Sequence, residues 1–142
     1  MLLGEFVQKL DAKNRFTLPA KYRPRFADGV VVTQGLDGCL VVFNKAGWES
    51  FAESWLQRLD PLSREGRLVS RFVYAGASES ELDGQGRVML PQPLMEHAGL
   101  SRDIVVAGVR DFLEVWDLEA WKSVQTESEG SVEDVTERLS QH

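Results

Sequence analysis

Cysteine, histidine and long apolar runs are scarce in this 142-residue chain. The single cysteine, Cys39, cannot form an internal disulfide, and it excludes a cysteine-rich metal site. No apolar run approaches the ~18 residues that a membrane-spanning helix needs. The first residues also lack the basic segment and the long apolar segment of a secretory signal. We therefore expect a cytoplasmic protein that does not interact with a membrane.

Familiar catalytic and cofactor-binding motifs are absent as well. The sequence has no phosphate-binding P-loop, no HExxH zinc motif, no GxSxG nucleophile elbow and no paired CxxC. Gly84-Gln-Gly86 precedes an expected strand rather than a helix, so it is not a dinucleotide-binding loop. Neither His97 nor His142 has a cysteine or aspartate constellation beside it. We expect a protein that is not an enzyme, with no catalytic residue, no metal site and no cofactor.

Basic residues are outnumbered, because 16 of them stand against 22 acidic ones for a net charge of −6. That total alone argues against nucleic acid as a partner. The distribution is uneven: residues 9–25 hold six basic side chains and one acidic, whereas residues 126–142 hold five acidic and one basic. This asymmetry is typical of a surface that faces a polyanion, combined with a solvated acidic tail. A solvated basic face is the alternative interpretation.

What the chain does contain is an internal repeat with a spacing of 72–73 residues. Leu10–Pro19 matches Leu82–Pro91, with Leu, Asp, Arg, Leu and Pro in step. Val31–Phe43 matches Ile104–Trp116 one residue further on. Two copies are too few for a solenoid, which needs about three repeats to bury its faces. We therefore predict two similar halves that close on each other.

The first copy begins with a pattern typical of a β-hairpin. Phe6–Leu10 is an expected strand, Asp11–Asn14 a turn, and Arg15–Leu18 the returning strand. Alternation with period 2 places Phe16 and Leu18 together on one face of that strand.

The second copy repeats the pattern around the turn Asp83–Gly86. Asp11 and Asp83 are expected to cap the two turns, because an aspartate carboxylate can accept hydrogen bonds from backbone amides two residues on. A second hairpin follows in each copy, formed by residues 30–33 with 40–43 and by residues 104–107 with 113–116.

Helical patterns lie around and between the copies. A short helix is expected after Pro91, and an apolar stripe predicts a helix after the N-cap Asn44. A matching helix starts at Asp117 and fades into a polar, marginal segment. We expect repeat 1 at residues 5–52, a helical connector at 53–80, repeat 2 at 81–124 and an acidic tail at 125–142.

Two cations in the first copy point to DNA. Lys13 lies at the tip of the expected turn and Arg15 opens the returning strand, on the face opposite Phe16. A two-stranded ribbon fits the major groove of DNA, where Arg or Lys reaches guanine O6 and N7. The alternative is that Arg15, and Arg87 in the second copy, pair with the turn-capping aspartates.

Two Asp-x-x-x-Arg turns, Asp11–Arg15 and Asp83–Arg87, are each followed by x-x-Leu-Pro. Together with the tracts Arg71–Ala77 and Glu114–Trp116, they resemble the MraZ regulators, which are built from two AbrB/SpoVT-like swapped-hairpin domains. The resemblance spans about residues 1–124. It implies an α+β fold, mainly β with short helices. In that fold tandem ββαββ repeats interleave into a pseudo-twofold, double-ψ-like swapped-hairpin barrel with peripheral helices.

The same resemblance implies a function and its partners. It implies a homo-oligomer, in the form of a ring, that binds double-stranded DNA at promoter direct repeats. The promoter is that of a bacterial cell-division and cell-wall gene cluster that contains the regulator's own gene, and the protein is nucleoid-associated. The family's basic DNA-contacting positions fall on Lys13 and Arg15, with Arg87 in the second turn, and Lys9 in the basic segment is a further candidate.

The two turns are expected to differ in their roles. Gln85 occupies the position that Lys13 has in the first copy, so the first turn should be the main reader of DNA. Arg87 should then mainly pair with Asp83. A different class of function also fits the net charge of −6 and the tryptophan-rich insertion, namely a non-enzymatic oligomeric scaffold for protein partners.

Overall fold

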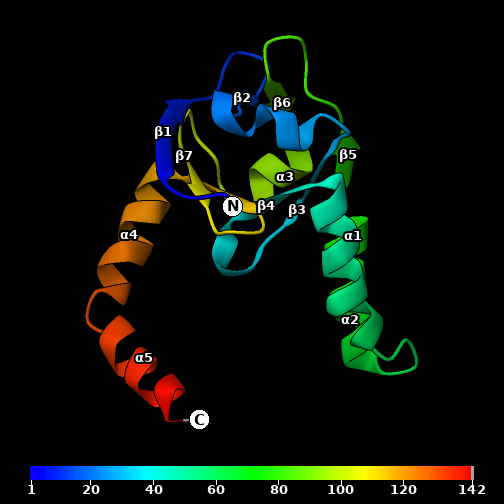
Figure 1. Ribbon diagram of the computed structural model, residues 1–142, viewed down its shortest axis with the longest axis vertical. Coiled ribbons are helices and arrows are strands. Elements are labelled where there is room, and N and C mark those ends of the chain that lie inside the picture. Colours follow the sequence, from blue (N-terminus) through cyan, green and yellow to red (C-terminus); the bar gives the residue numbers. More distant parts are fainter. Residues whose placement is uncertain (142) are drawn as a thin grey trace.

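The computed structural model describes residues 1–141 and shows a six-stranded antiparallel sheet with helices around it (Figure 1). The strand order in the sheet is β1-β7-β8-β4-β3-β5. Its strands are β1 (Glu5–Lys9), β3 (Val30–Gln34), β4 (Leu40–Asn44), β5 (Ser78–Ser80), β7 (Asp103–Gly108) and β8 (Leu113–Asp117). A separate two-stranded ribbon pairs β2 (Arg15–Thr17) with β6 (Arg87–Met89).

The α+β class is confirmed, and the two halves interleave. β1 pairs with β7, β4 with β8 and β2 with β6, so each of these ladders joins strands from different copies of the repeat. Within residues 1–141 the six-stranded sheet is open, with β1 and β5 as its edges. The expected barrel is therefore not closed by backbone hydrogen bonds in this part of the chain.

The predicted hairpin between residues 6–10 and 15–18 is wrong as a backbone ladder. Both strands pair with the other half of the chain instead. Between β1 and β2, the side-chain amide of Gln8 donates to the carbonyl of Thr17 over 2.9 Å and accepts from its N–H over 2.8 Å. Pairing across the halves brings Phe16 against Val88, and both side chains have no exposed surface. Burial of these two apolar groups favours the swapped arrangement.

The two later hairpins are confirmed. β3 pairs with β4 from Val30↔Asn44 to Gln34↔Leu40, and β7 pairs with β8 from Ile104↔Asp117 to Gly108↔Leu113. Their inward-facing side chains join those of the ribbon in one apolar core. That core includes Phe16, Leu18, Phe26, Val30, Val32, Leu40, Val42, Val88, Leu90, Ile104, Val106 and Leu113.

The helices that follow Asn44, Pro91 and Asp117 begin where the sequence predicts, and Asn44 is the expected cap. The side chain of Asn44 accepts from the N–H of Gly47 over 2.6 Å, and Asp117 caps the later helix in the same way. The predicted apolar stripe is α-helical only to residue 54, and residues 56–58 then form a short 3₁₀ helix. The α-helices are α1 (Lys45–Ser54), α2 (Arg64–Ser70), α3 (Gln92–His97), α4 (Leu118–Ser128) and α5 (Val132–Ser140).

Four shorter helical segments connect these elements. They are the 3₁₀ helices η1 (Ala20–Phe26), η2 (Leu36–Gly38) and η3 (Leu56–Arg58), and the π-helix η4 (Arg71–Ala75). The acidic segment that was expected to be marginal contains the regular helix α5, while His142 lies outside the described residues. No helix between residues 1 and 141 has the length and apolar character to cross a membrane.

The two Asp-capped turns lie at one end of the molecule, and α1, α2, α4 and α5 extend toward the other (Figure 1). The loops before β2 and β6 lie side by side at one end (Figure 1). At the other end, the arm formed by α1 and α2 and the arm formed by α4 and α5 extend from opposite sides of the sheet. The fold thus separates a two-turn tip from a two-armed base.

Candidate nucleic-acid interface

The tip consists of two turns with the same hydrogen bonding. In the first turn, Oδ1 of Asp11 accepts the backbone N–H groups of Lys13 and Arg15, each over 2.9 Å. In the second, Oδ1 of Asp83 accepts the N–H groups of Gln85 and Arg87 over the same distance. Each carboxylate therefore satisfies two amides that the tight turn leaves without a backbone partner.

Four charged side chains join the two turns into one network. Arg15 Nε lies 2.7 Å from Asp11 Oδ2, and Arg87 Nε lies 2.7 Å from Asp83 Oδ2. Longer contacts cross between the halves, from Arg15 Nη1 to Asp83 Oδ2 at 3.6 Å and from Arg87 Nη1 to Asp11 Oδ2 at 3.8 Å. The network is pseudo-symmetric and holds both guanidinium groups in defined positions.

This symmetry corrects the expectation that the two arginines differ in pairing. Arg15 is bound to its own turn aspartate as closely as Arg87 is to Asp83. The side chains of Arg15 and Arg87 are also similarly exposed, at 24% and 27%. Any difference between the turns must come from other side chains.

The main difference lies at the tips. Lys13 in the first turn and Gln85 in the second are both exposed and occupy equivalent positions beyond the capping aspartate. Asn14 and Gly86, the next residues, both adopt the left-handed backbone conformation, with φ of 57° and 73°. Asparagine and glycine are the residues that tolerate this conformation best. The turns therefore share a backbone shape but differ by one charge.

Lys9, the other sequence candidate, lies away from the tips. It is in β1, and its ammonium group is 3.3 Å from Asp103 Oδ1 on the neighbouring strand β7. Both side chains are at least half exposed, so this ion pair contributes little to stability. The structure thus gathers Lys13, Arg15 and Arg87 at one end and leaves Lys9 on the side of the sheet.

A fourth cation at this end was missed by the sequence reasoning. The side chain of Arg23, from η1, lies directly beside Gly86, where a Cβ atom would come within 2.2 Å of Arg23 Nε. That nitrogen also donates to the carbonyl of Leu18 over 3.2 Å. The repeat contains a signal for this contact: at the equivalent places, separated by 72 residues, Gly86 replaces Asn14 and Met95 replaces Arg23.

The hydrogen bonds of the turns also change the acidity of their carboxyl groups. Partial burial by itself raises the pKa of Asp11, but bonds from Arg15 and Lys13 outweigh it and bring the pKa below its ordinary 3.8. For Asp83, the backbone N–H of Arg87 is the largest influence, and it lowers the pKa to about 2 despite partial burial. Both groups are therefore anionic at neutral pH.

We expect the stabilising effect of Asp83 to disappear in acid. Since its pKa in the folded protein is about 2 against an ordinary 3.8, its ionised form stabilises the fold above pH 4 and ceases to do so as the pH falls toward 2. Asp83→Asn should lower the melting temperature most above pH 4, and the difference from the parent should narrow toward pH 2. Thermal unfolding followed by circular dichroism across this range measures the effect.

The exposed carboxylate of Asp28, outside the turns, supplies the matched control Asp28→Asn. This variant should unfold like the parent at each pH. A melting-temperature difference for Asp83→Asn that is equally large at pH 2 and pH 6 would contradict the role of the ionised carboxylate.

The described residues contain no group of three or more His, Cys, Asp or Glu side chains arranged to hold a metal ion. The buried thiol of Cys39 has its pKa raised to about 12, chiefly by burial and secondarily by Glu114. At the tip, the groups that can bind a partner are the fixed guanidinium groups, the ammonium group of Lys13 and the backbone amides of the turns.

Comparison with known proteins places the whole chain in one family. A family model described as "MraZ protein, putative antitoxin-like" matches residues 1–71 and 73–142. A protein of Natranaerobius thermophilus named Transcriptional regulator MraZ is 40% identical over 139 residues, covering 98% of this chain and 96% of that protein. Proteins of the same name from Lactiplantibacillus plantarum and Lachnoclostridium phytofermentans are 39% and 43% identical, and cover 98% and 87% of this chain. They in turn are covered over 98% and 86% of their own length. The chain therefore belongs to the MraZ family.

Proposed function

We propose that this protein is a sequence-specific DNA-binding transcriptional regulator whose two-turn tip contacts the major groove. The observation that carries the proposal is the pair of adjacent Asp-capped turns, with Lys13 at one tip and two guanidinium groups held beside it. The name Transcriptional regulator MraZ, borne by relatives that match nearly the whole chain, supports the same class of function.

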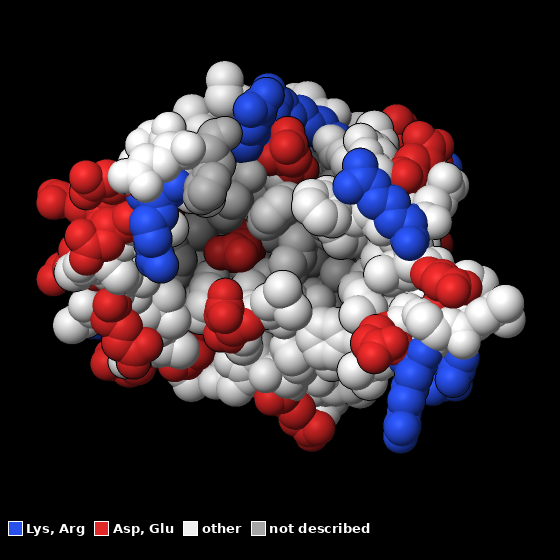
Figure 2. Space-filling model, turned by 90° about the horizontal axis from the view of Figure 1, so that it is seen from below, with Lys and Arg blue, Asp and Glu red and all other residues white. Residues whose placement is uncertain are grey.

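Local charge favours the tip as the surface for DNA. Four cations (Lys13, Arg15, Arg23 and Arg87) stand against the two turn aspartates, although the whole chain carries −6. Charges farther away than the Debye length, about 8 Å at physiological salt, are largely screened. At the opposite end, basic side chains are interspersed with acidic ones around a hollow (Figure 2). The tip is therefore the better surface for a polyanion.

The pairing of each arginine with an aspartate is compatible with reading a base. The ion pairs of Arg15 use Nε and Nη1, which leaves Nη2 for a further acceptor. A guanidinium group fixed by a carboxylate loses little rotamer freedom when it binds, so less entropy is lost per hydrogen bond formed. Lys13, at the exposed tip of the first turn, is suited to a phosphate.

Several copies acting together would supply the affinity that one tip lacks. A chain with two unlike halves presents unlike surfaces, and unlike surfaces make head-to-tail contacts that close into a ring when the rotation permits. A ring would place several tips on spaced direct repeats and raise the overall affinity without any new contact. We propose direct repeats in the promoter of the protein's own cell-division and cell-wall gene cluster as this target.

DNA binding is expected to weaken steeply with salt. Each phosphate contact should add about 0.9 to the slope of log affinity against log salt concentration, because binding releases condensed counterions. Fluorescence anisotropy with the DNA upstream of the protein's own gene, from low to moderate salt, measures the slope. A duplex of equal length with its repeats scrambled is the control. Equal affinity for both duplexes, or affinity independent of salt, would contradict the proposal.

The scaffold alternative is favoured by one observation, the exposed apolar side chains on the α1–α2 arm. Trp55, Leu62 and Leu68 are 63%, 87% and 67% exposed. A scaffold would assemble through such a surface but would not distinguish the two duplexes. The same anisotropy experiment therefore separates the two functions.

A further inference from the structure

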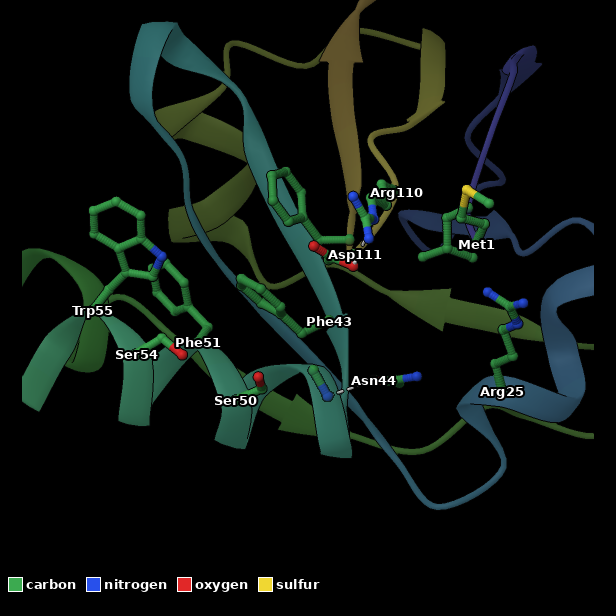
Figure 3. A pocket seen from close by; sticks show the side chains of 13 residues that line it. Met1, Arg25, Phe43, Asn44, Ser50, Phe51, Ser54, Trp55, Arg110 and Asp111 are labelled. Carbon is green, nitrogen blue, oxygen red and sulfur yellow. Dashed lines mark hydrogen bonds and ion pairs between the residues drawn. The ribbon is translucent and has the colours of Figure 1, made fainter. Parts of the chain in front are cut away.

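A cavity of about 540 Å³ lies at the base of the molecule, far from the two-turn tip. It opens between α1, the β7–β8 turn and the N-terminus, with Phe51 and Trp55 at one end and Met1 and Arg25 at the other (Figure 3). Aromatic rings of Phe43, Phe51 and Phe112 form its apolar lining. Nothing in the DNA-binding proposal uses this cavity.

The rim of the cavity is more basic than acidic. Arg25 and Arg110 line it against the single carboxylate of Asp111, and the N-terminal residue Met1 lies beside them. Trp55 is 63% exposed, and Cζ of Arg58 lies over its ring, 5.6 Å from the ring centre. An apolar floor with a cationic rim suits an occupant that has an apolar stripe and acidic flanks.

Helix α5 has those properties, and all of its residues are exposed in the part of the chain that the structure describes. Val132, Val135 and Leu139 fall at i, i+3 and i+7, on one side of the helix. They are 57%, 39% and 70% exposed, which is unusual for three apolar residues on one stripe. The rest of α5 is acidic, since it bears Glu133, Asp134 and Glu137 against the single cation Arg138.

The same chain does not bring the two surfaces together. α4 packs on β7 and β8, and α5 continues away from it on the side of the sheet opposite α1 and α2 (Figure 1). The cavity and the stripe are therefore separate, unlike faces of one molecule. Complementary faces that cannot meet within a chain are satisfied between chains, head to tail.

We propose that α5 of one copy docks into the α1-side cavity of the next copy, with its apolar stripe on the aromatic lining and its acidic residues toward Arg25 and Arg110. This inference rests on the oligomer in the proposed function and specifies its contact. Each copy provides one helix and receives one helix, so successive copies join head to tail until they close into a ring. The tips, at the opposite end, remain free for DNA.

The test uses the full chain with one face altered at a time. Val135→Glu with Leu139→Glu places two charges on the stripe, while Trp55→Ala with Arg110→Glu alters the cavity. Arg110 has a φ of 68°, which strains glutamate no more than arginine. Native mass spectrometry should show the parent as an oligomer, and each double variant should fall to the 16.0 kDa monomer.

Mixing the two double variants is the decisive step. The stripe variant keeps an intact cavity and the cavity variant keeps an intact stripe. Together they should form a one-to-one dimer, at twice the 16.0 kDa monomer mass, that grows no further. Matched controls alter exposed residues outside the contact: Glu127→Lys on α4, and Leu62→Glu beyond the cavity. Both controls should keep the parent's mass.

Each outcome is informative. A stripe variant that stays oligomeric, or a mixture that stays monomeric, would overturn the docking of α5. If α5 bound its own chain's cavity, the variants would change the melting temperature but not the mass, which would also overturn it. A monomeric parent would overturn the oligomer as well. Anisotropy with a single-repeat duplex reports on the tip separately, since the stripe variant should bind it as the parent does.

Discussion

Replacing Lys13 and Arg15 together with alanine is expected to eliminate measurable binding to promoter DNA while the chain stays folded and assembled. A base contact by arginine is worth ~1–3 kcal/mol, a loss of roughly 5- to 150-fold for each engaged turn. In an assembly that binds through several turns, these losses multiply. Asp11 keeps its two backbone hydrogen bonds in the variant, so the first turn retains its shape. Anisotropy and native mass spectrometry measure the two properties.

The second turn supplies a matched control. Gln85→Ala with Arg87→Ala removes side chains at the equivalent positions and breaks the equivalent pair of ion contacts. Because the network is pseudo-symmetric, both double variants should lower the melting temperature by similar amounts. The second-turn variant should bind DNA more weakly than the parent but still measurably, since it keeps Lys13. Loss of binding in the second-turn variant alone would reverse the assignment of the reading turn.

The capped turns were predictable because everything that determines them is local. An aspartate, two intervening residues and a residue that tolerates positive φ are enough to shape the loop, and they recur in both copies. The hairpins of residues 30–44 and 104–117 are local in the same sense, since their strands are joined by short connections. Asn44 and Asp117 are the N-caps of their helices, and each accepts a hydrogen bond from the backbone N–H of the residue three positions later.

The exchange of strands between halves could not be obtained from local pattern. The alternation in residues 15–18 specifies which face is buried but not which strand lies alongside. The alternation is the same whether this strand pairs with β1 or with β6, so it does not select the partner. In the structure β1 and β2 form no backbone ladder, and the side-chain amide of Gln8 makes the two hydrogen bonds between them instead. Only the resemblance to a swapped-hairpin family indicated the interleaving.

Pairing of both arginines with the turn aspartates was only the alternative expectation, and the place of Arg23 was missed, for a related reason. The tips differ in charge, with Lys13 in one and Gln85 in the other, and this predicted a difference between Arg15 and Arg87 as well. The pairing of the arginines depends on the turn aspartates, which are the same in both copies. Arg23 meets Gly86 across the exchanged halves, 63 residues apart. Such a contact becomes visible in the sequence only when the two copies are compared position by position.

The ribbon that carries both turns depends on Phe16, so Phe16→Ala is expected to destabilise the whole fold. Its ring has no exposed surface and packs in the core opposite Val88 of β6. Truncation of a buried phenylalanine costs ~3–5 kcal/mol, from lost burial and the cavity left behind. That is a large fraction of the roughly 5–15 kcal/mol by which a typical domain is stable. Urea denaturation should show a lower midpoint with a similar slope.

Met89 provides the control within the same ribbon. It pairs with Arg15 in the register of β2 and β6, but its side chain is 58% exposed, so Met89→Ala should change stability by no more than ~0.5 kcal/mol. Because β2 and β6 each lead out of one turn, loosening the ribbon affects both turns at once. DNA binding by Phe16→Ala should therefore fail at the temperature at which the core melts. A variant that kept the parent's urea midpoint would mean that the ribbon is not anchored through Phe16.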